Sequence, residues 1–347
     1  MRRITIKDIA REAGVSPQTV SRAINNKGEI RPQTRERILR IAERLGYRPN
    51  SVARSLATQR TQNVGLVVPD VSNPFFAEVA RGIADTAHQA NYNVFLCNTD
   101  ENVERERSAV HSLEAQRVDG IILCSSRLSE GELIKLADRY GPLVLVNRQI
   151  DHPRTGCVLV DDAQGTEDAV RYLLELGHHS IGLLAGPEVS HSGRERKRGY
   201  LEAMRAHRLT PRAAWQMHCP PQASGGQAAA GRLLRRAPEL TSLLAYNDLV
   251  AVGALRACAE LGLDVPGDLA IVGCDDIPLA ALVSPALTTI HIPKYDLGQQ
   301  AMGLLLSMMR DEDVPPGPIV LLPQLVIRDS ATEPTGGPQP LAKRSLP

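Results

Sequence analysis

The sequence predicts a small all-α head at residues 1–49 and a larger α/β body at residues 61–330, joined by a linker at residues 50–60. Three short helical patterns crowd the head, whereas the body alternates short apolar runs with amphipathic helical patterns. The sign of the net charge changes at the same place. Residues 1–60 contain 14 Lys and Arg and 5 Asp and Glu, whereas the rest of the chain contains 26 Lys and Arg and 34 Asp and Glu. A basic head on an acidic body indicates that the head meets phosphate groups.

Composition narrows the class of protein. The 347 residues are 43% hydrophobic and 23% charged, as in a soluble globular protein with one small and one large unit. No apolar run approaches the roughly 20 residues of a membrane span, and the basic start at Arg2 and Arg3 has no apolar stretch behind it. We therefore expect a cytoplasmic location and no membrane partner. The six cysteines form no Cys-x-x-Cys pair, so we expect neither a metal site nor a cofactor.

The first helix of the head is predicted over residues 6–13. Thr5 can cap it, and Asp8 stands three residues further on, as in a capping box. Ile9 and Ala13 share one face at helical spacing. Gly14 then breaks the pattern, as a tight turn between two helices requires.

The second helix is predicted to begin after Ser16, a typical N-cap, with Pro17 at the first helical position, where a missing N–H costs nothing. Val20 and Ile24 face inward, and a third helix begins at Pro32. The second helix leaves short polar side chains and one arginine on its outer face: Gln18, Thr19, Ser21 and Arg22.

Two helices joined by a glycine turn, with polar side chains outward, are typical of a helix-turn-helix. The second helix of this motif lies in the major groove of DNA. Gln18 can form a bidentate pair with adenine, and Arg22 with guanine. Thr19, Ser21 and the helix N-terminus suit phosphate contacts. The alternative is a plain three-helix bundle with a polar surface, but the basic charge of the head favours the DNA reader.

The head resembles the DNA-binding head of the lactose repressor (LacI) family. The matching residues are Ile6–Ala10, Ala13–Ser16, Thr19–Arg22 and Leu45–Asn50. The resemblance implies a homodimer that binds a pseudo-palindromic, double-stranded operator.

The resemblance also implies roles for individual residues. Pro17, Gln18 and Arg22 match the positions that set sequence choice in this family. Arg31 departs from the family, which usually has a serine capping the third helix there, and it can add a phosphate contact. The DNA contacts that we expect are Thr5, Ser16, Pro17, Gln18, Thr19, Ser21, Arg22, Asn25, Arg31, Asn50, Ala53 and Leu56.

Within the linker, Leu56 is a large apolar residue among small and polar ones. One interpretation is a leucine that packs on the body. The segment also resembles the hinge helix of the LacI family, which forms on DNA and pairs with its twin in a dimer. That resemblance implies that Leu56 wedges into the minor groove at a central CG step of the operator.

We expect the substitution Leu56→Ala to lower operator affinity strongly, because the kinked DNA would lose its wedge. Ligand binding by the body should stay intact. Anisotropy titration with operator DNA measures the operator affinity, and calorimetry with the small molecule that the body binds measures ligand affinity. Unchanged operator affinity would remove the wedge role.

The body contains eight short apolar runs separated by helical patterns. Apolar, non-alternating strands between helices indicate doubly wound parallel sheets with both faces covered. Ligands of such sheets bind beyond the carboxyl ends of the strands. The runs lie at residues 64–68, 94–97, 120–123, 143–146, 157–160, 181–184, 243–246 and 270–273.

Aromatic, amide and charged side chains follow several of these runs. Phe75 and Phe76, two of only three phenylalanines, come after the first. Asn98 follows the second, Arg148 the fourth and Asp275 the last. Aromatic faces together with paired donors and acceptors are what a polyhydroxyl ligand needs.

The body resembles the type I periplasmic sugar-binding fold that the LacI family carries as its sensor, and the resemblance covers about residues 4–330. It implies two doubly wound parallel-sheet subdomains with the effector between them. Phe76 can instead belong to the core, and of two neighbouring residues we assign Asn247 to the ligand and Asp248 to a helix cap. The effector contacts that we expect are Phe75, Phe76, Asn98, Arg148, Arg196, Asn247 and Asp275.

One departure concerns the aromatic platform that many sugar-binding members carry just before the position of Ser224. This chain has Cys219–Gln222 there, without an aromatic ring. An effector smaller or more polar than a standard pyranose is therefore an open alternative.

Taken together, these patterns predict a sequence-specific transcriptional repressor whose operator affinity is controlled by a small molecule, a sugar or sugar derivative. A purine-like corepressor would use the same parts, and a solute-binding receptor is a further alternative. We expect no enzyme and no catalytic residue, because no nucleophile elbow, phosphate loop or dinucleotide fingerprint occurs. The tail at residues 331–347 is rich in Pro and Gly, so we expect it to be disordered rather than to form a tetramerising coiled coil.

Overall fold

The computed structural model describes residues 4–25, 28, 30–47 and 60–333. The chain divides into two compact units, residues 1–61 with the head and residues 62–347 with the body. Within the described ranges, no helix has both the length and the apolar character needed to cross a membrane.

Three helices build the head: α1 (Ile6–Ala13), α2 (Pro17–Ile24) and α3 (Pro32–Arg44). Ile9, Val20 and Ile38, one from each helix, are fully buried in a single apolar cluster. The helices therefore begin and end close to where the sequence places them.

Local polar interactions fix the ends of α1 and α2. The Asp8 carboxylate accepts hydrogen bonds from the Thr5 N–H at 2.9 Å and from the Thr5 hydroxyl at 2.7 Å. Gly14 follows α1 with φ at 62°, in the left-handed region that favours glycine. Ser16 Oγ accepts a hydrogen bond from the Thr19 N–H at 3.1 Å, so it caps α2 as predicted.

Two arginines of α3 bind the carboxyl ends of the other helices. Arg35 Nε donates a hydrogen bond to the Ala23 carbonyl oxygen at 3.3 Å. Arg37 Nη2 donates one to the Ala13 carbonyl oxygen at 2.9 Å. Both contacts place a cation at the negative end of a helix dipole, and they tie α3 to α1 and α2.

The first sheet of the body has six parallel strands in the order β11-β5-β4-β3-β1-β2. β1 lies between β3 and β2, so the strand order reverses at β1. The strands are β1 (Asn63–Val68), β2 (Asn93–Asn98), β3 (Gly120–Cys124), β4 (Leu143–Val146), β5 (Thr155–Val160) and β11 (Ile319–Leu321).

The second sheet has the order β12-β10-β9-β8-β6-β7, and its order reverses at β6. Its strand pairs are parallel except for β12, which runs antiparallel to β10 and is not among the eight predicted runs. β12 follows β11 after only Leu322 and Pro323 but joins the other sheet, so it returns to β10 from the first subdomain. The strands are β6 (Ile181–Ala185), β7 (Gln216–His218), β8 (Ser242–Ala245), β9 (Ala270–Asp275), β10 (Thr288–His291) and β12 (Gln324–Val326).

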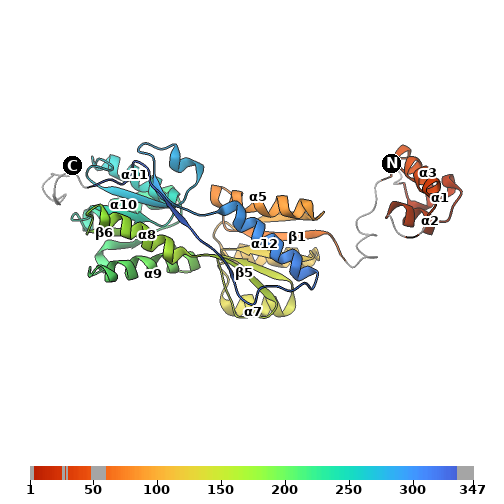
Figure 1. The fold of residues 1–347 in the computed structure, drawn as a ribbon, viewed down its shortest axis with the longest axis horizontal. Coiled ribbons are helices and arrows are strands. Elements are labelled where there is room, and N and C mark those ends of the chain that lie inside the picture. Colours follow the sequence, from red (N-terminus) through yellow and green to blue (C-terminus); the bar gives the residue numbers. More distant parts are fainter. Residues whose placement is uncertain (1–3, 26–27, 29, 48–59, 334–347) are drawn as a thin grey trace. The chain divides into compact units, whose positions relative to one another are not determined.

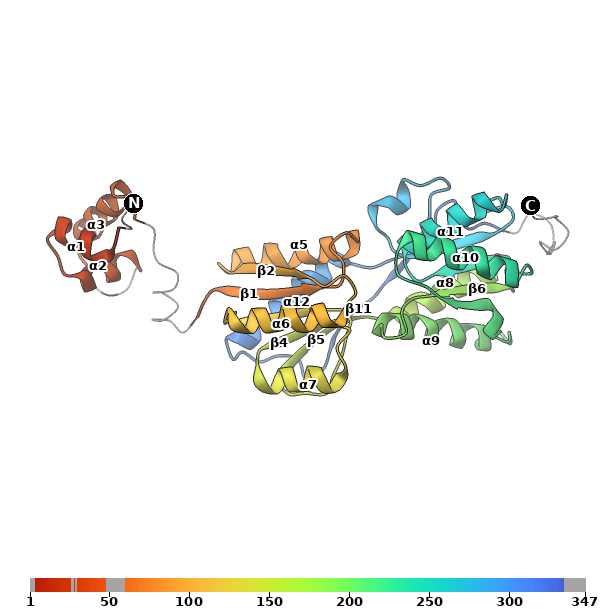
Figure 2. The same ribbon diagram turned by 180° about the vertical axis from the view of Figure 1, so that it is seen from behind.

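Helices cover both faces of each sheet (Figures 1 and 2). α5 and α12 pack on one face of the first sheet, and α6 and α7 on the other. α8 and α9 flank one face of the second sheet, and α10 and α11 the other. The helices are α5 (Pro74–Gln89), α6 (Val103–Ala115), α7 (Glu130–Arg139), α8 (Asp162–Glu175), α9 (His191–Ala206), α10 (Ala223–Arg236), α11 (Asp248–Glu260) and α12 (Lys294–Met309).

The body divides into two subdomains, one around each sheet, and the chain passes between them three times. It crosses after β5, after β10 and between β11 and β12. Three connections allow the subdomains to move relative to each other while they remain joined. Such a hinged pair is a common basis of ligand-driven closure.

The packed body extends past residue 330, where the sequence predicts that it ends and a disordered tail begins. Ala331 is buried, and its carbonyl oxygen accepts a hydrogen bond from the Tyr172 hydroxyl at 3.2 Å. His178 Nε2 lies 2.9 Å from the Thr332 carbonyl oxygen. The prediction of disorder for residues 334–347 lies outside the described residues.

Candidate functional site

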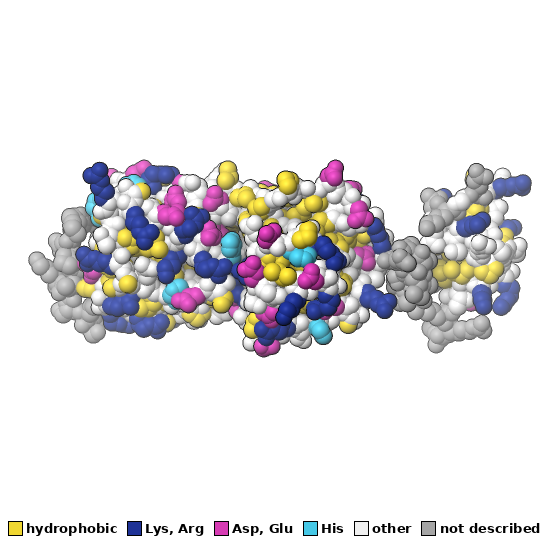
Figure 3. All heavy atoms as spheres, turned by 90° about the horizontal axis from the view of Figure 1, so that it is seen from below, with side chains coloured by type: hydrophobic (Ala, Val, Ile, Leu, Met, Phe, Trp, Pro, Cys, Tyr) yellow, Lys and Arg dark blue, Asp and Glu magenta, His cyan; other side chains and the backbone are white. Residues whose placement is uncertain are grey.

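The outer face of α2 is free to reach a partner. Pro17, Gln18 and Arg22 are exposed, while Val20 and Ala23 on the opposite face are buried. Basic side chains are also spread over the face of the head in view in Figure 3. The helix that the sequence assigns to the major groove therefore presents its base-reading candidates to solvent.

The shorter polar residues of the head hold the helix ends. Ser16 Oγ lies 2.9 Å from Thr19 Oγ1, and Asn25 Nδ2 donates a hydrogen bond to the Ser21 carbonyl oxygen at 2.9 Å. Arg31 stands at the N-cap of α3 without a side-chain capping bond, and it is exposed. Three further predicted DNA contacts, Asn50, Ala53 and Leu56, lie outside the described residues.

In the body, a cleft opens where the carboxyl ends of the two sheets face each other. Both strand-order reversals, β1 beside β3 and β6 beside β8, contribute to it, as expected for doubly wound sheets. Five of the seven predicted effector residues line it. The lining is Asn73, Phe75, Phe76, Glu101, Ser125, Asn147, Ser192, Arg196, Pro221, Tyr246, Asn247 and Asp275.

Arg196 on α9 is the buried centre of the cleft. Its Nε donates a hydrogen bond to Asp162 Oδ1 at 2.8 Å, and its Nη2 lies 3.4 Å from Asp275 Oδ1. Its Nη1 donates to the Tyr246 carbonyl oxygen, and its guanidinium lies 5.1 Å from the centre of the Tyr246 ring. Burial would lower the pKa of Arg196, but the two carboxylates outweigh burial and hold that pKa above its ordinary value.

Asp275 ends β9 with its side chain buried beside Arg196. Burial raises the pKa of Asp275 to about 6, against the opposing attraction of Arg196 and Lys294. Lys294 Nζ donates a hydrogen bond to the Asp275 carbonyl oxygen at 2.6 Å. Burial thus favours the neutral form of the Asp275 carboxyl, and the two cations favour its charged form.

The assignment of Asp248 to the helix cap is wrong, because Asn247 caps α11. Asn247 Oδ1 accepts a hydrogen bond from the Val250 N–H at 2.9 Å, and its Nδ2 donates to the Pro221 carbonyl oxygen at 3.2 Å. Asp248 instead lies in the core, where Oδ2 accepts a hydrogen bond from the Ile277 N–H at 2.8 Å. Asn247 still lines the cleft, but both its polar atoms already have partners.

Phe76 was predicted to contact the ligand or to belong to the core, and both Phe75 and Phe76 do line the cleft and pack in the core. Their rings meet edge to face, with centroids 5.1 Å apart at 85°. Asn73 holds them in place, because its Oδ1 accepts a hydrogen bond from the Phe75 N–H at 3.0 Å.

The other two predicted effector residues do not line the cleft. Asn98 is exposed on the edge strand β2, and its Oδ1 accepts a hydrogen bond from the Val71 N–H at 2.9 Å. Glu101, three residues further along, lines the cleft in its place. Arg148 lies beside the cleft with Nη2 at 3.5 Å from the Leu128 carbonyl oxygen, and its neighbour Asn147 provides the lining.

The sequence did not predict a set of polar contacts that runs across the cleft. Arg127, in the loop after β3, pairs with Glu101 at 2.8 Å and also interacts with Tyr246 of the other subdomain. The Tyr246 hydroxyl lies 3.0 Å from Ser190 Oγ. No motif marks these residues, because these contacts exist only after both sheets have formed; the position of Arg127 after a strand was the one available signal.

The cleft shows two further features of a ligand site. Four buried polar atoms around it have no hydrogen-bond partner among the described residues: Arg127 Nη1, Asn147 Oδ1, Arg148 Nε and Ser192 Oγ. Ser125, Asn147 and Asp275 have φ values of 47°, 53° and 111°, and such strained backbone clusters at functional sites.

The cavity volume between the lining residues is about 30 Å³, enough for one or two water molecules. A sugar needs several times that space. In this arrangement the space between the lining residues is therefore too small for a sugar.

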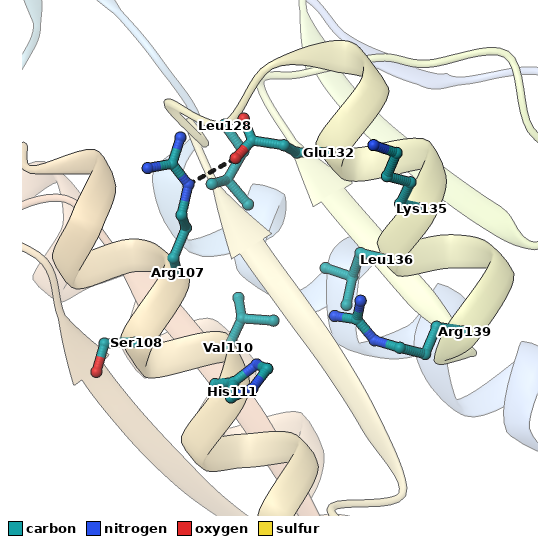
Figure 4. A pocket seen from close by; sticks show the side chains of 9 residues that line it. All are labelled: Arg107, Ser108, Val110, His111, Leu128, Glu132, Lys135, Leu136 and Arg139. Atoms are coloured by element: carbon teal, nitrogen blue, oxygen red, sulfur yellow. Dashed lines mark hydrogen bonds and ion pairs between the residues drawn. The ribbon is translucent and has the colours of Figure 1, made fainter.

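A larger groove of about 500 Å³ lies elsewhere, between α6 and α7 (Figure 4). Val110, Leu128 and Leu136 form its apolar part. Arg107 pairs with Glu132 across it at 2.6 Å. None of the predicted effector residues lines this groove.

Comparison with known proteins decides the family. Residues 5–50 match the model of "Bacterial regulatory proteins, lacI family", and residues 61–317 match that of "Periplasmic binding proteins and sugar binding domain of LacI family". The chain belongs to the LacI family. It is 36% identical to catabolite control protein A of Priestia megaterium, over 93% of this chain and 97% of that protein. It is 33% identical to the PurR repressor of Photobacterium profundum, over 95% and 99%.

Solved structures agree with this assignment. A Lac repressor dimer bound to operator and the anti-inducer ONPF is 30% identical, with a TM-score of 0.87 over 95% of this LacI-family chain and all of that one. The protein is thus a DNA-binding transcriptional regulator with a helix-turn-helix head and two parallel-sheet subdomains. Its relatives are regulators rather than enzymes.

Proposed function

We propose that this LacI-family protein is a homodimeric, cytoplasmic repressor whose operator affinity changes when a small molecule binds between the subdomains of the body. The observation that carries the proposal is the cleft, in which buried, unpartnered polar atoms from both subdomains meet around Arg196. A site built from two subdomains can report ligand binding as a change in their relative position.

The proposed effector is a sugar or sugar derivative. The aromatic rings of Phe75 and Phe76 and the polar atoms of Asn147 and Ser192 offer the mixed surface that hydroxylated rings need. Among the relatives, one solved regulator, CelR, is in complex with cellobiose. Pro221 lines the cleft where an aromatic platform is absent, which favours an effector with more polar groups than a stacked pyranose.

The proposed mechanism is a shift between two arrangements of the subdomains. An effector that binds one arrangement more tightly stabilises it by the difference in binding free energy. Arg127 of one subdomain interacts with Tyr246 of the other, so a ligand that inserts between them would replace this interaction. The linker at residues 50–60 would pass the change to the head. A corepressor would use the same parts with the opposite sign.

Two exposed apolar sites support the proposed homodimer. Phe95 and Leu96 on the edge strand β2 are 43% and 49% exposed, and Leu282 near β9 is 79% exposed. Large exposed apolar side chains on an unpaired edge mark interaction surfaces. A two-fold dimer would cover each such surface with its own copy.

The test of DNA reading uses α2. Gln18→Ala and Arg22→Ala should each weaken operator binding by about 1–3 kcal/mol and relax the preference for one base pair, because each removes a bidentate base contact. Selection from a random DNA library, followed by anisotropy titration of the enriched sites, measures both effects. Arg40→Ala, an exposed arginine on α3, is the matched control. Unaltered base preferences in both α2 variants would contradict this role of the helix.

A further inference from the structure

The N-terminus of α9 faces the cleft and carries the positive end of the helix dipole. The first turn of α9 contains no acidic residue that would offset this potential. Ser190 caps the helix by accepting a hydrogen bond from the Gly193 N–H at 3.2 Å. Ser192, in that turn, lines the cleft with its hydroxyl buried and unpartnered. A long helix with this geometry attracts anions through its dipole and free N–H groups.

Two arginines near this helix end lack a carboxylate partner. Arg148 makes no ion pair among the described residues, and its buried Nε has no hydrogen-bond partner. Arg194 Nη1 donates only to the carbonyl oxygens of Glu188 and Val189, at 3.2 and 3.1 Å. Arg127 and Arg196, by contrast, each pair with carboxylates at 2.8 Å. Of the four arginines in and beside the cleft, Arg127 and Arg196 therefore have a carboxylate partner, and Arg148 and Arg194 have none among the described residues.

Arg148 and Arg194 come from different subdomains, and they lie in the chain beside Asn147 and Ser192, which line the same cleft. Burial lowers the pKa of Arg148, and the positive charge of Arg194 lowers it further. Burial likewise lowers the pKa of His191, with added repulsion from Arg194 and Arg148 against the attraction of Glu195 and Asp162. His191 is therefore held in its neutral form, and the positive side chains near the N-terminus of α9 are Arg148 and Arg194.

Most of the acidic side chains near these two arginines already form hydrogen bonds or ion pairs with other residues. The Glu106 carboxylate accepts a hydrogen bond from the Arg127 N–H at 2.8 Å. Glu195 pairs with Arg198 at 2.7 Å, and Asp162 pairs with Arg196. Glu130, which also attracts Arg148, is exposed in the first turn of α7. None of these carboxylates forms an ion pair with Arg148 or Arg194 among the described residues.

We propose that the effector carries an anionic group, a carboxylate or a phosphate, on a polyhydroxyl body, and that this group binds at the N-terminus of α9 beside Arg148 and Arg194. The inference rests on the proposed function, because it names the chemistry of the same effector. The anion would accept hydrogen bonds from Arg148 Nε and Ser192 Oγ, which lack partners. Asn147 Oδ1 would accept a hydrogen bond from a hydroxyl of the body of the ligand.

The test compares matched ligands on the full-length protein at constant ionic strength. The sets are glucose, glucuronate and glucose 6-phosphate, and ribose, ribonate and ribose 5-phosphate, with inorganic phosphate as the minimal probe. Thermal unfolding screens the panel, and calorimetry measures the dissociation constants. We expect one anionic member to bind about tenfold tighter, or more, than its neutral counterpart. The carboxylate and phosphate members distinguish a sugar acid from a sugar phosphate.

Two variants locate the anion. Arg148→Gln and Arg194→Gln, studied separately, should each reduce the preference for the anionic member by about tenfold or more. Arg205→Gln, an exposed arginine near the other end of α9, should keep it. Circular dichroism and the unfolding midpoint without ligand establish that each variant folds.

Several results would overturn the anion site. The first is a neutral sugar that binds as tightly as its anionic counterpart. The second is a preference for the anionic sugar that is unchanged in both arginine variants. The third is a thermal screen in which neither phosphate nor any anionic sugar stabilises the protein. If a neutral sugar binds and changes operator affinity, only the anion site fails and the proposed function stands. If the wild-type protein selects no operator sequence, the proposed function itself fails.

Discussion

Replacing Arg196 with methionine should abolish effector binding and destabilise the body by about 3–5 kcal/mol. The substitution keeps most of the side-chain volume but removes the charge between Asp162 and Asp275, both of which are buried. Two carboxylates would then remain without their shared cation, and a buried charge without a partner is strongly destabilising. Urea unfolding followed by the fluorescence of the single tryptophan, buried at Trp215, reports on the body.

A matched control lies on the same helix. Arg198 pairs with Glu195 and Glu202 at the surface and is half exposed, so Arg198→Met should cost less than about 1 kcal/mol. The double variant with Arg196→Met and Asp162→Asn tests the cause, because it removes one of the two orphaned charges. It should be more stable than Arg196→Met alone. If Arg196→Met is as stable as wild type, Arg196 does not neutralise these carboxylates.

The sequence predicted the parts of the fold that depend on near neighbours. Ser16 caps α2 through a residue three positions away, and Gly14 takes the φ of 62° that its turn needs. The order of strands and helices in the body was equally accessible, because buried parallel strands leave continuous apolar runs. These features need no knowledge of what packs against them.

Contacts between distant segments were harder to predict. Arg196 meets Asp162 and Asp275, which are 34 and 79 positions away, and only the family resemblance pointed to it. Asn98 and Glu101 are both polar residues near the end of β2, and the bend of the loop decides which one enters the cleft. A capping pattern alone did not separate Asn247 from Asp248, because the decisive partners of Asp248 come from other strands and loops.

Asp248 leads to a prediction about stability and pH. Its side chain is fully buried and accepts hydrogen bonds from the Ile277 N–H and the Thr289 hydroxyl, with no ion pair among the described residues. Burial, with added repulsion from Asp275, raises the pKa of Asp248 to about 8. An unfolded aspartate has a pKa of about 3.9, so the folded state binds the proton more tightly. The contribution of Asp248 to stability is therefore greatest at low pH and falls as pH rises from about 4 to 8.

Comparison of wild type with Asp248→Asn isolates this effect. Asparagine stays neutral, so the free energy of unfolding of the variant relative to wild type should rise with pH by up to about 1.4 kcal/mol per unit. The range from pH 6 to 8 is the cleanest, because Asp275, with a pKa of about 6, titrates mainly below it and does so in both proteins. His178 and His191 also cancel in the comparison. The exposed Asp151→Asn is the control, and it should follow the wild-type profile. Parallel profiles for wild type and Asp248→Asn would mean that Asp248 does not change its charge over this range, and that the core around Thr289 holds it in one protonation state.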